Sequence, residues 1–138
     1  MTSLTITLPI YWEKTFKTKP SKVVLTGMNW YRCANYFDQN RFKQEFSDLV
    51  KSQLGTAVST KLPYTLNILL YYKNPSCDPS NIVPLVEKVL LDVLQKEGCI
   101  KQDNVKYHLG TTWCVAGQDK ENPRCEITVT PHITQDTL

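Results

Sequence analysis

The chain has 138 residues, 41% hydrophobic and 21% charged, a composition typical of a globular domain that buries a core. No apolar run reaches the roughly 20 residues of a membrane-spanning helix, and the N-terminus lacks the basic and apolar regions of a signal peptide. We therefore expect one domain over residues 1–138, in the cytoplasm and without a membrane partner.

The net charge of +3 is unevenly distributed along the chain. Residues 1–45 carry seven basic and three acidic side chains, whereas the remainder carries nine basic and ten acidic ones. A basic segment beside an acidic body suits a polyanion partner that also meets a cation-binding site. The same lysines are also typical of a solvated loop.

The first half of the chain predicts a strand, a long loop and a helix. Residues 4–10 (LTITLPI) alternate apolar and polar side chains and predict a strand. Residues 11–40 show no clear period, so we expect a long basic loop with interleaved aromatics and a short strand at KVVLT. Residues 41–54 place apolar side chains at helical spacing before Gly55, which predicts a helix with a glycine stop.

The second half predicts three further strands and one helix. Residues 64–72 (YTLNILLYY) form an apolar, aromatic strand, and residues 82–97 form a helix with Pro84 in its first turn and Ser80 or Asn81 as its N-cap. Strands are predicted over 104–116 and 124–132. The fold class is therefore α+β: a small mixed β-sheet covered by two helices.

The five cysteines predict free thiols in a reducing compartment, because they are odd in number and contain no CxxC. A zinc site is conceivable, but its spacings match no common zinc pattern. Its members would be Cys99, His108, Cys114 and Cys125.

Polar side chains gather along and around the second helix. Asp78 follows the apolar strand directly, and Asp103 lies just past the helix. Lys88 and Asp92 are four residues apart, and Asn81 is two turns before Lys88, so the three share one helix face. Carboxylates suit Mg²⁺, and a lysine offsets phosphate charge in a metal-dependent nuclease. An Asp before Pro is also a common turn former, and a Lys–Asp pair at this spacing a common surface pair.

These segments resemble the RusA family of Holliday-junction resolvases, which is common in phages and prophages. The opening TITLP is similar to the family's first strand, and RCEITV to its last. The family pattern is an Asp-x-Asp-Asn turn, a helix with a Lys and an Asp-Ala-Leu, a Gly, and an Asp-Asp pair. Here DPSN, EKVLLDVL, KEGCI and QDN stand at those places.

The resemblance implies roles for individual residues. Asp78 matches the first catalytic Asp, Lys88 the catalytic Lys, and Asp103 the second member of the acidic pair. Asn81 matches the turn Asn, as a supporting residue, and Asp92 matches the helix Asp. Asp78, Asp92 and Asp103 would bind Mg²⁺ or alternatively Mn²⁺.

The sequence departs from the family pattern in three places. Ser80 replaces the second turn Asp, Gln102 replaces the first Asp of the pair, and four extra residues separate Asn81 from Lys88. Losing the carboxylate at Ser80 removes a metal ligand of the family, which Glu87 or Asp92 would have to replace.

The expected function is a Mg²⁺-dependent, structure-selective endonuclease that resolves four-way DNA junctions as a homodimer, in a bacterial or phage-infected cell. Basic side chains of the N-terminal part would hold the DNA backbone. They are Lys14, Lys17, Lys19, Lys22, Arg32 and Arg41. The alternatives are a non-catalytic DNA-binding or regulatory protein of the same fold, permitted by Ser80, and an RNA-binding α+β module.

Overall fold

The central sheet has four strands with one parallel and two antiparallel pairings. In the computed structural model, residues 3–55 and 61–132 are described, and the strands lie in the order β1-β6-β4-β5. β6 pairs antiparallel with both β1 and β4, whereas β4 and β5 run parallel. Their bounds are β1 Leu4–Pro9, β4 Tyr64–Tyr72, β5 His108–Gln118 and β6 Arg124–Pro131. The expected small mixed sheet is confirmed.

One face of the sheet is buried and the other is rich in threonine. Alternate residues of β4, from Tyr64 to Leu70, are buried, as are Ile127 on β6 and Ile6 on β1. The residues between them face away, and Thr5 on β1 shares a hydroxyl contact with Thr128 on β6. The period-two alternation in the sequences of β1 and β6 therefore corresponds to burial on one face of the sheet.

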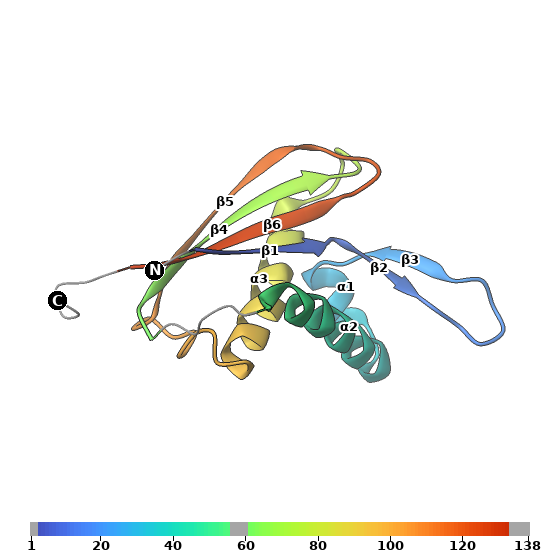
Figure 1. Ribbon diagram of the computed structural model, residues 1–138. Coiled ribbons are helices and arrows are strands. Elements are labelled where there is room, and N and C mark those ends of the chain that lie inside the picture. The colour runs from blue at the N-terminus through green and yellow to red at the C-terminus, as the bar shows by residue number, and fades with distance from the viewer. Residues whose placement is uncertain (1–2, 56–60, 133–138) are drawn as a thin grey trace.

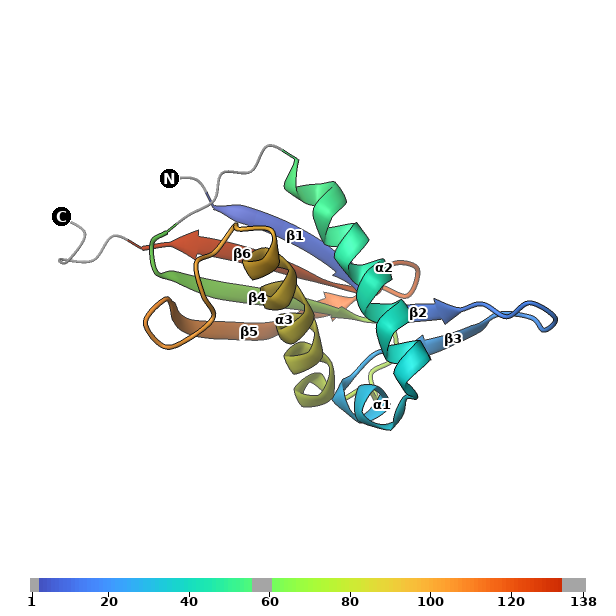
Figure 2. The same ribbon diagram turned by 90° about the horizontal axis from the view of Figure 1, so that it is seen from below.

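Two long helices cover the buried face, as Figures 1 and 2 show: α2 (Tyr36–Leu54) and α3 (Pro79–Lys96). α3 connects the parallel strands β4 and β5, as a helix commonly does between parallel strands. It buries nine side chains, because the sheet covers one side of it and the other helices cover another. A third, short helix, α1 (Met28–Cys33), precedes α2.

The prediction of a long loop over residues 11–40 is wrong. This segment forms an antiparallel ribbon of β2 (Tyr11–Lys14) and β3 (Lys22–Leu25), followed by α1 and the first turn of α2. The predicted short strand at KVVLT is confirmed as β3. The ribbon projects beyond the sheet in Figure 1, so its residues show no regular alternation of burial.

Aromatic packing holds this N-terminal part against α2. The Trp12 ring lies 5.5 Å from Trp30, and Trp30 lies 5.1 Å from Phe42 on α2. The indole N–H of Trp12 donates to a carboxylate oxygen of Glu45. Trp30 is thus part of the core packing, whereas Tyr36 and Phe37 at the start of α2 remain exposed.

Helix boundaries differ from the predictions where side chains cap them. α2 begins five residues early, because Asn35 accepts a hydrogen bond from the backbone N–H of Asp38. α3 begins at Pro79 with Asp78 as N-cap, so Ser80 and Asn81 are not the cap and Pro84 lies in the second turn. Pro79 occupies the first helical position, where a missing N–H is tolerated.

β5 begins at His108, four residues later than predicted. The backbone N–H groups of Tyr107 and His108 both donate to the Asn104 carbonyl, which forms a turn before the strand. Within the described residues, no helix is both long enough and apolar enough to cross a membrane. All five cysteines are free, as predicted.

Candidate functional site

The outer face of α3 carries Lys88 and Asp92, and both side chains are exposed. Four residues separate them, which places them one turn apart on the same face. They form a ridge, because both line a groove toward α2 and also a second pocket on the other side. This ridge brings a cation and a carboxylate to the boundary between two cavities.

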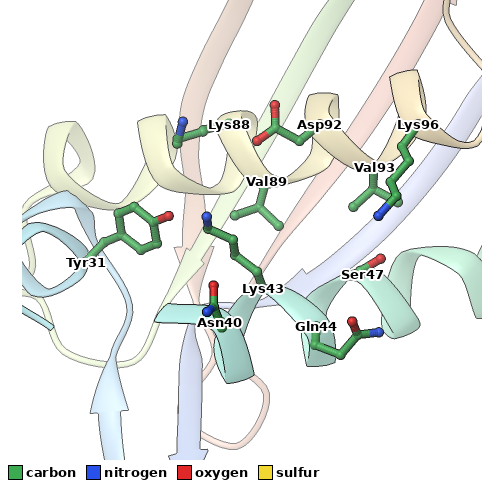
Figure 3. Close-up of a pocket in the computed structure, with 10 residues that line it drawn as sticks. All are labelled: Tyr31, Asn40, Lys43, Gln44, Ser47, Lys88, Val89, Asp92, Val93 and Lys96. Carbon is green, nitrogen blue, oxygen red and sulfur yellow. The ribbon is translucent and has the colours of Figure 1, made fainter. Parts of the chain in front are cut away.

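The groove between α2 and α3 has a volume of about 310 Å³ and is rich in ammonium groups. Figure 3 shows Lys43 reaching from α2 toward Tyr31 and α3, and Lys96 reaching from α3 toward α2. The groove is lined by Tyr31, Asn40, Lys43, Gln44, Ser47, Lys88, Val89, Asp92, Val93 and Lys96. Three lysines and four neutral polar side chains form a surface suited to phosphate oxygens.

Lys43 remains charged in this groove. A hydrogen bond with the Tyr31 side chain raises its pKa, partial burial opposes that effect, and the negative charge of Asp92 raises the pKa further. The ammonium therefore stays protonated at neutral pH and is available for an anion.

The second pocket, of about 350 Å³, contains carboxylates. It is lined by Pro84, Glu87, Lys88, Leu91, Asp92 and Asp103. Asp103 belongs to the segment between α3 and β5 and faces the middle of the helix rather than its end. The crossover thus brings Asp103 to the pocket that Lys88 and Asp92 also line.

A network beneath this pocket positions Glu87 and the Asp103 segment. The Tyr64 hydroxyl donates to the Gln102 carbonyl at 3.1 Å, next to Asp103. The Thr111 hydroxyl donates to Glu87 Oε1 at 3.1 Å and lies 2.8 Å from His108 Nε2. Burial, and then the negative charges of Asp103 and Glu87, raise the pKa of Tyr64 to about 12. Both carboxylates therefore act on the same buried hydroxyl.

Sequence reasoning missed Tyr64, Thr111 and His108 as neighbours of the pocket. Tyr64 and His108 are 44 positions apart, but their rings stack at 5.3 Å because β4 and β5 pair in parallel register. No local pattern signals this contact, since the register is set by the two strands together.

Asp78 and Asn81 lie at the other end of α3 and have structural partners. Asp78 Oδ1 accepts from the Ser80 N–H at 3.0 Å as the N-cap, and Asn81 Oδ1 accepts from the Asn29 N–H at 2.8 Å. Lys88 follows Asp78 by ten residues, about 15 Å along a helix axis. The Asp103 pocket does not include Asp78, so a metal shared by Asp78 and Asp103 stays a prediction.

The carboxylate pocket fits a hard cation by its donor chemistry. Mg²⁺ keeps several waters and is commonly held by one or two carboxylates together with substrate phosphates. Glu87, Asp92 and Asp103 supply such oxygen donors around one pocket. Among the described residues, no three His, Cys, Asp or Glu side chains gather as a ready metal-binding group, so Glu87, Asp92 and Asp103 line one pocket without forming a preformed three-ligand site. The four residues considered for zinc do not form such a group either.

The predicted DNA-binding residues fall into two groups. Lys14 forms an ion pair with Asp38, and Arg41 donates to Thr15 Oγ1 at 2.8 Å, so these two also stabilise the ribbon on α2. The others are exposed: Lys17, Lys19, Lys22 and Arg32. Lys19 lies 5.5 Å from the centre of the Phe16 ring, close to the ribbon tip.

No protein-family model matches the chain, and no curated protein matches its sequence significantly. The likeness to RusA resolvases therefore stays a prediction from the motif residues.

Proposed function

We propose that the protein is a Mg²⁺-dependent endonuclease that cuts branched DNA, in the manner of RusA-like resolvases, and acts as a homodimer on four-way junctions. One observation carries this proposal: Lys88 and Asp92 form the common wall of a lysine-lined groove and a carboxylate pocket that contains Asp103. A phosphodiester and a divalent cation are the two ligands that such a pair of neighbouring sites would accept.

Each side chain has a role in this proposal. Asp103 and Asp92, with Glu87, would hold Mg²⁺ or alternatively Mn²⁺, which when bound supplies Lewis acidity and an activated water. Lys88 would stabilise negative charge on the phosphate, and Lys43 and Lys96 would hold the adjoining backbone in the groove. Thr111 orients Glu87 toward the pocket by its hydrogen bond.

The ribbon would extend the contact with DNA. Lys17 and Lys19 are exposed in the turn between β2 and β3, and Lys22 is exposed on β3. In the described part of the chain, none of the three forms an ion pair like that of Lys14 with Asp38. Basic side chains on a projecting ribbon suit backbone contacts with one arm of a junction. Such an enzyme would act in the cytoplasm of a bacterial or phage-infected cell, where branched DNA arises.

A non-catalytic junction-binding protein is the second candidate, and a specific observation favours it. Ser80 has no carboxylate, and the Asp78 carboxylate is engaged in capping α3. In this case the lysine groove would bind DNA, and the carboxylate pocket would not support cleavage.

The test is nicking of a synthetic four-way junction in the presence of Mg²⁺ or Mn²⁺. Asp103→Asn and Asp92→Asn should each reduce nicking by roughly 100-fold or more while binding persists, because each removes charge at the cation. Asp48→Asn is the matched control, since Asp48 is exposed on α2 and lines neither cavity of the proposed site.

Three results would change the proposal. If Asp78→Asn abolishes nicking and Asp92→Asn does not, the metal is held at the start of α3, as the family pattern implies. If the wild-type protein binds junctions and never nicks them, the non-catalytic alternative holds. If it neither binds nor nicks them, both are wrong.

A further inference from the structure

β5 forms one outer edge of the sheet and carries no charged side chain of the Lys, Arg, Asp or Glu type over its eleven residues. In the described part of the chain, β4 is its only partner strand. Exposed edge strands are usually protected by charges, prolines or a covering segment, because their free backbone groups pair with other chains. The lack of charge on β5 therefore needs a reason.

The opposite edge is covered by α2. The Gln53 side chain donates its Nε2 to the Thr7 carbonyl at 2.7 Å, and its Oε1 accepts from the Thr7 N–H at 2.7 Å. These two bonds occupy backbone groups in β1 that a further strand would use. Figure 2 shows β5 along the other side of the sheet, away from α2.

The regular part of β5 is the stretch Gly110–Val115. The register with β4 shifts at both ends of this stretch, as at β-bulges, which confines regular pairing to it. Trp113 and Val115 are 45% and 46% exposed, although their lateral neighbours Ile68 and Leu70 on β4 are completely buried. The stretch thus combines open backbone groups with incompletely covered apolar side chains.

We propose that β5 is the dimer interface: two copies of the chain pair through Gly110–Val115, antiparallel about a two-fold axis, and form one continuous sheet. An antiparallel strand pair about a two-fold axis is self-complementary, so identical surfaces meet. The absence of Lys, Arg, Asp and Glu on β5 removes charge repulsion at the contact. The two hydrogen bonds between Gln53 and Thr7 block strand pairing at β1, so the assembly stops at two chains.

This inference names the interface of the homodimer in the proposed function, and it places the interface beside the candidate site. Thr111 lies within the paired stretch and donates to Glu87 in the carboxylate pocket. The pairing therefore brings the two carboxylate pockets to the same side of the assembly, one in each half.

The test is sedimentation equilibrium without DNA or added metal, from roughly 1 to 100 µM chain. The paired stretch has six residues on each side, so the dimer should be weak, and this range covers dissociation constants of roughly micromolar order. Trp113→Lys and Val115→Lys should each weaken the dimer about 100-fold, because they place a charge at the contact. The matched control is Val23→Lys on β3, where Val23 is 60% exposed and lies outside the interface.

Cross-linking provides a second measurement that needs no destabilising substitution. Cys114 is exposed within the paired stretch, and antiparallel pairing centred on Thr112 or Trp113 separates the two copies of Cys114 by roughly 8 to 14 Å. A bismaleimide of that length should yield a dimer that is lost in Cys114→Ser and retained in Cys33→Ser. If a lysine variant fails to fold, this result decides the question.

Several outcomes would overturn the inference. They are a wild-type monomer at every concentration, a dimer unaffected by both lysine substitutions, an assembly that grows beyond two chains, or cross-linking through Cys33 alone. A monomer would leave the β5 edge for a strand of another protein. Because no DNA is present, a failure here leaves the nuclease proposal standing, and a dimer that never nicks DNA leaves this interface standing.

Discussion

Gly27 precedes α1, and a side chain at this position would collide with Asn81 on α3. A Cβ built on Gly27 would lie 2.3 Å from Asn81 Nδ2 and 2.6 Å from its Cγ. The backbone at Gly27 is extended, with φ −150° and ψ 174°, so alanine adopts it without strain. The cost of Gly27→Ala therefore comes from the neighbour and not from the backbone.

The size of this cost follows from what Asn81 must give up. To admit the methyl group, its side chain has to turn away and lose the bond from the Asn29 N–H. A hydrogen bond of this kind contributes about 1 kcal/mol, and added volume in a packed contact costs about 1 to 3 kcal/mol. We expect Gly27→Ala to lower the free energy of unfolding by about 2 kcal/mol.

A double-mutant cycle isolates this contact. Asn81→Ala alone should cost about 1 kcal/mol, and adding Gly27→Ala to it only about 0.5 kcal/mol, because the obstacle is gone. Urea unfolding at one fixed protein concentration measures all four proteins. Gly117→Ala is the control, since a Cβ at Gly117 meets nothing within 4 Å. Equal costs of Gly27→Ala in both backgrounds would refute the reasoning.

Two further predictions concern alkaline stability and DNA binding. The Tyr64 pKa is about 12 in the fold against 10.0 ordinarily, so the unfolded chain loses this proton first, and stability should fall by about 2 kcal/mol as pH rises from 10 to 12. In Tyr64→Phe, the free energy of unfolding measured with urea should fall less over that range. Cys125, whose pKa burial also raises to about 12, contributes equally in both proteins. An equal fall in both proteins would mean that Tyr64 is not the cause. Lys17→Ala with Lys19→Ala should flatten the dependence of log junction affinity on log salt by about 2, since each phosphate contact contributes roughly 0.9. A binding titration at several salt concentrations measures this, with Lys51→Ala, which removes the ion pair to Glu97, as control; an unchanged slope would mean that the ribbon does not touch DNA.

Local patterns in the sequence determined most of the elements. β1, β6 and the buried face of α3 follow from side-chain periodicity, because burial on one face requires it in any fold. β4 follows from its apolar and aromatic composition. The α+β class followed from the order of these elements. Apart from the strand predicted at KVVLT, the ribbon was read as a loop, because Trp12 is the only buried residue of its two strands and a single buried side chain imposes no period.

The candidate site was only partly readable from the sequence. Lys88 and Asp92 share a helix face by their spacing alone, and the family pattern supplied Asp103. Asp78 was predicted as a metal ligand, and in the structure its carboxylate accepts a hydrogen bond from the Ser80 N–H as the N-cap of α3.

Tertiary structure decided what meets across long separations. The parallel pairing of β4 with β5 stacks Tyr64 on His108 and brings Thr111 to Glu87, and the crossover returns Asp103 to the middle of α3. It also decided that the β1 edge of the sheet is covered, because Gln53 reaches Thr7 only after α2 packs on the sheet. Periodicity is a property of neighbouring residues, whereas register, crossover and edge coverage arise only when separate elements pack together.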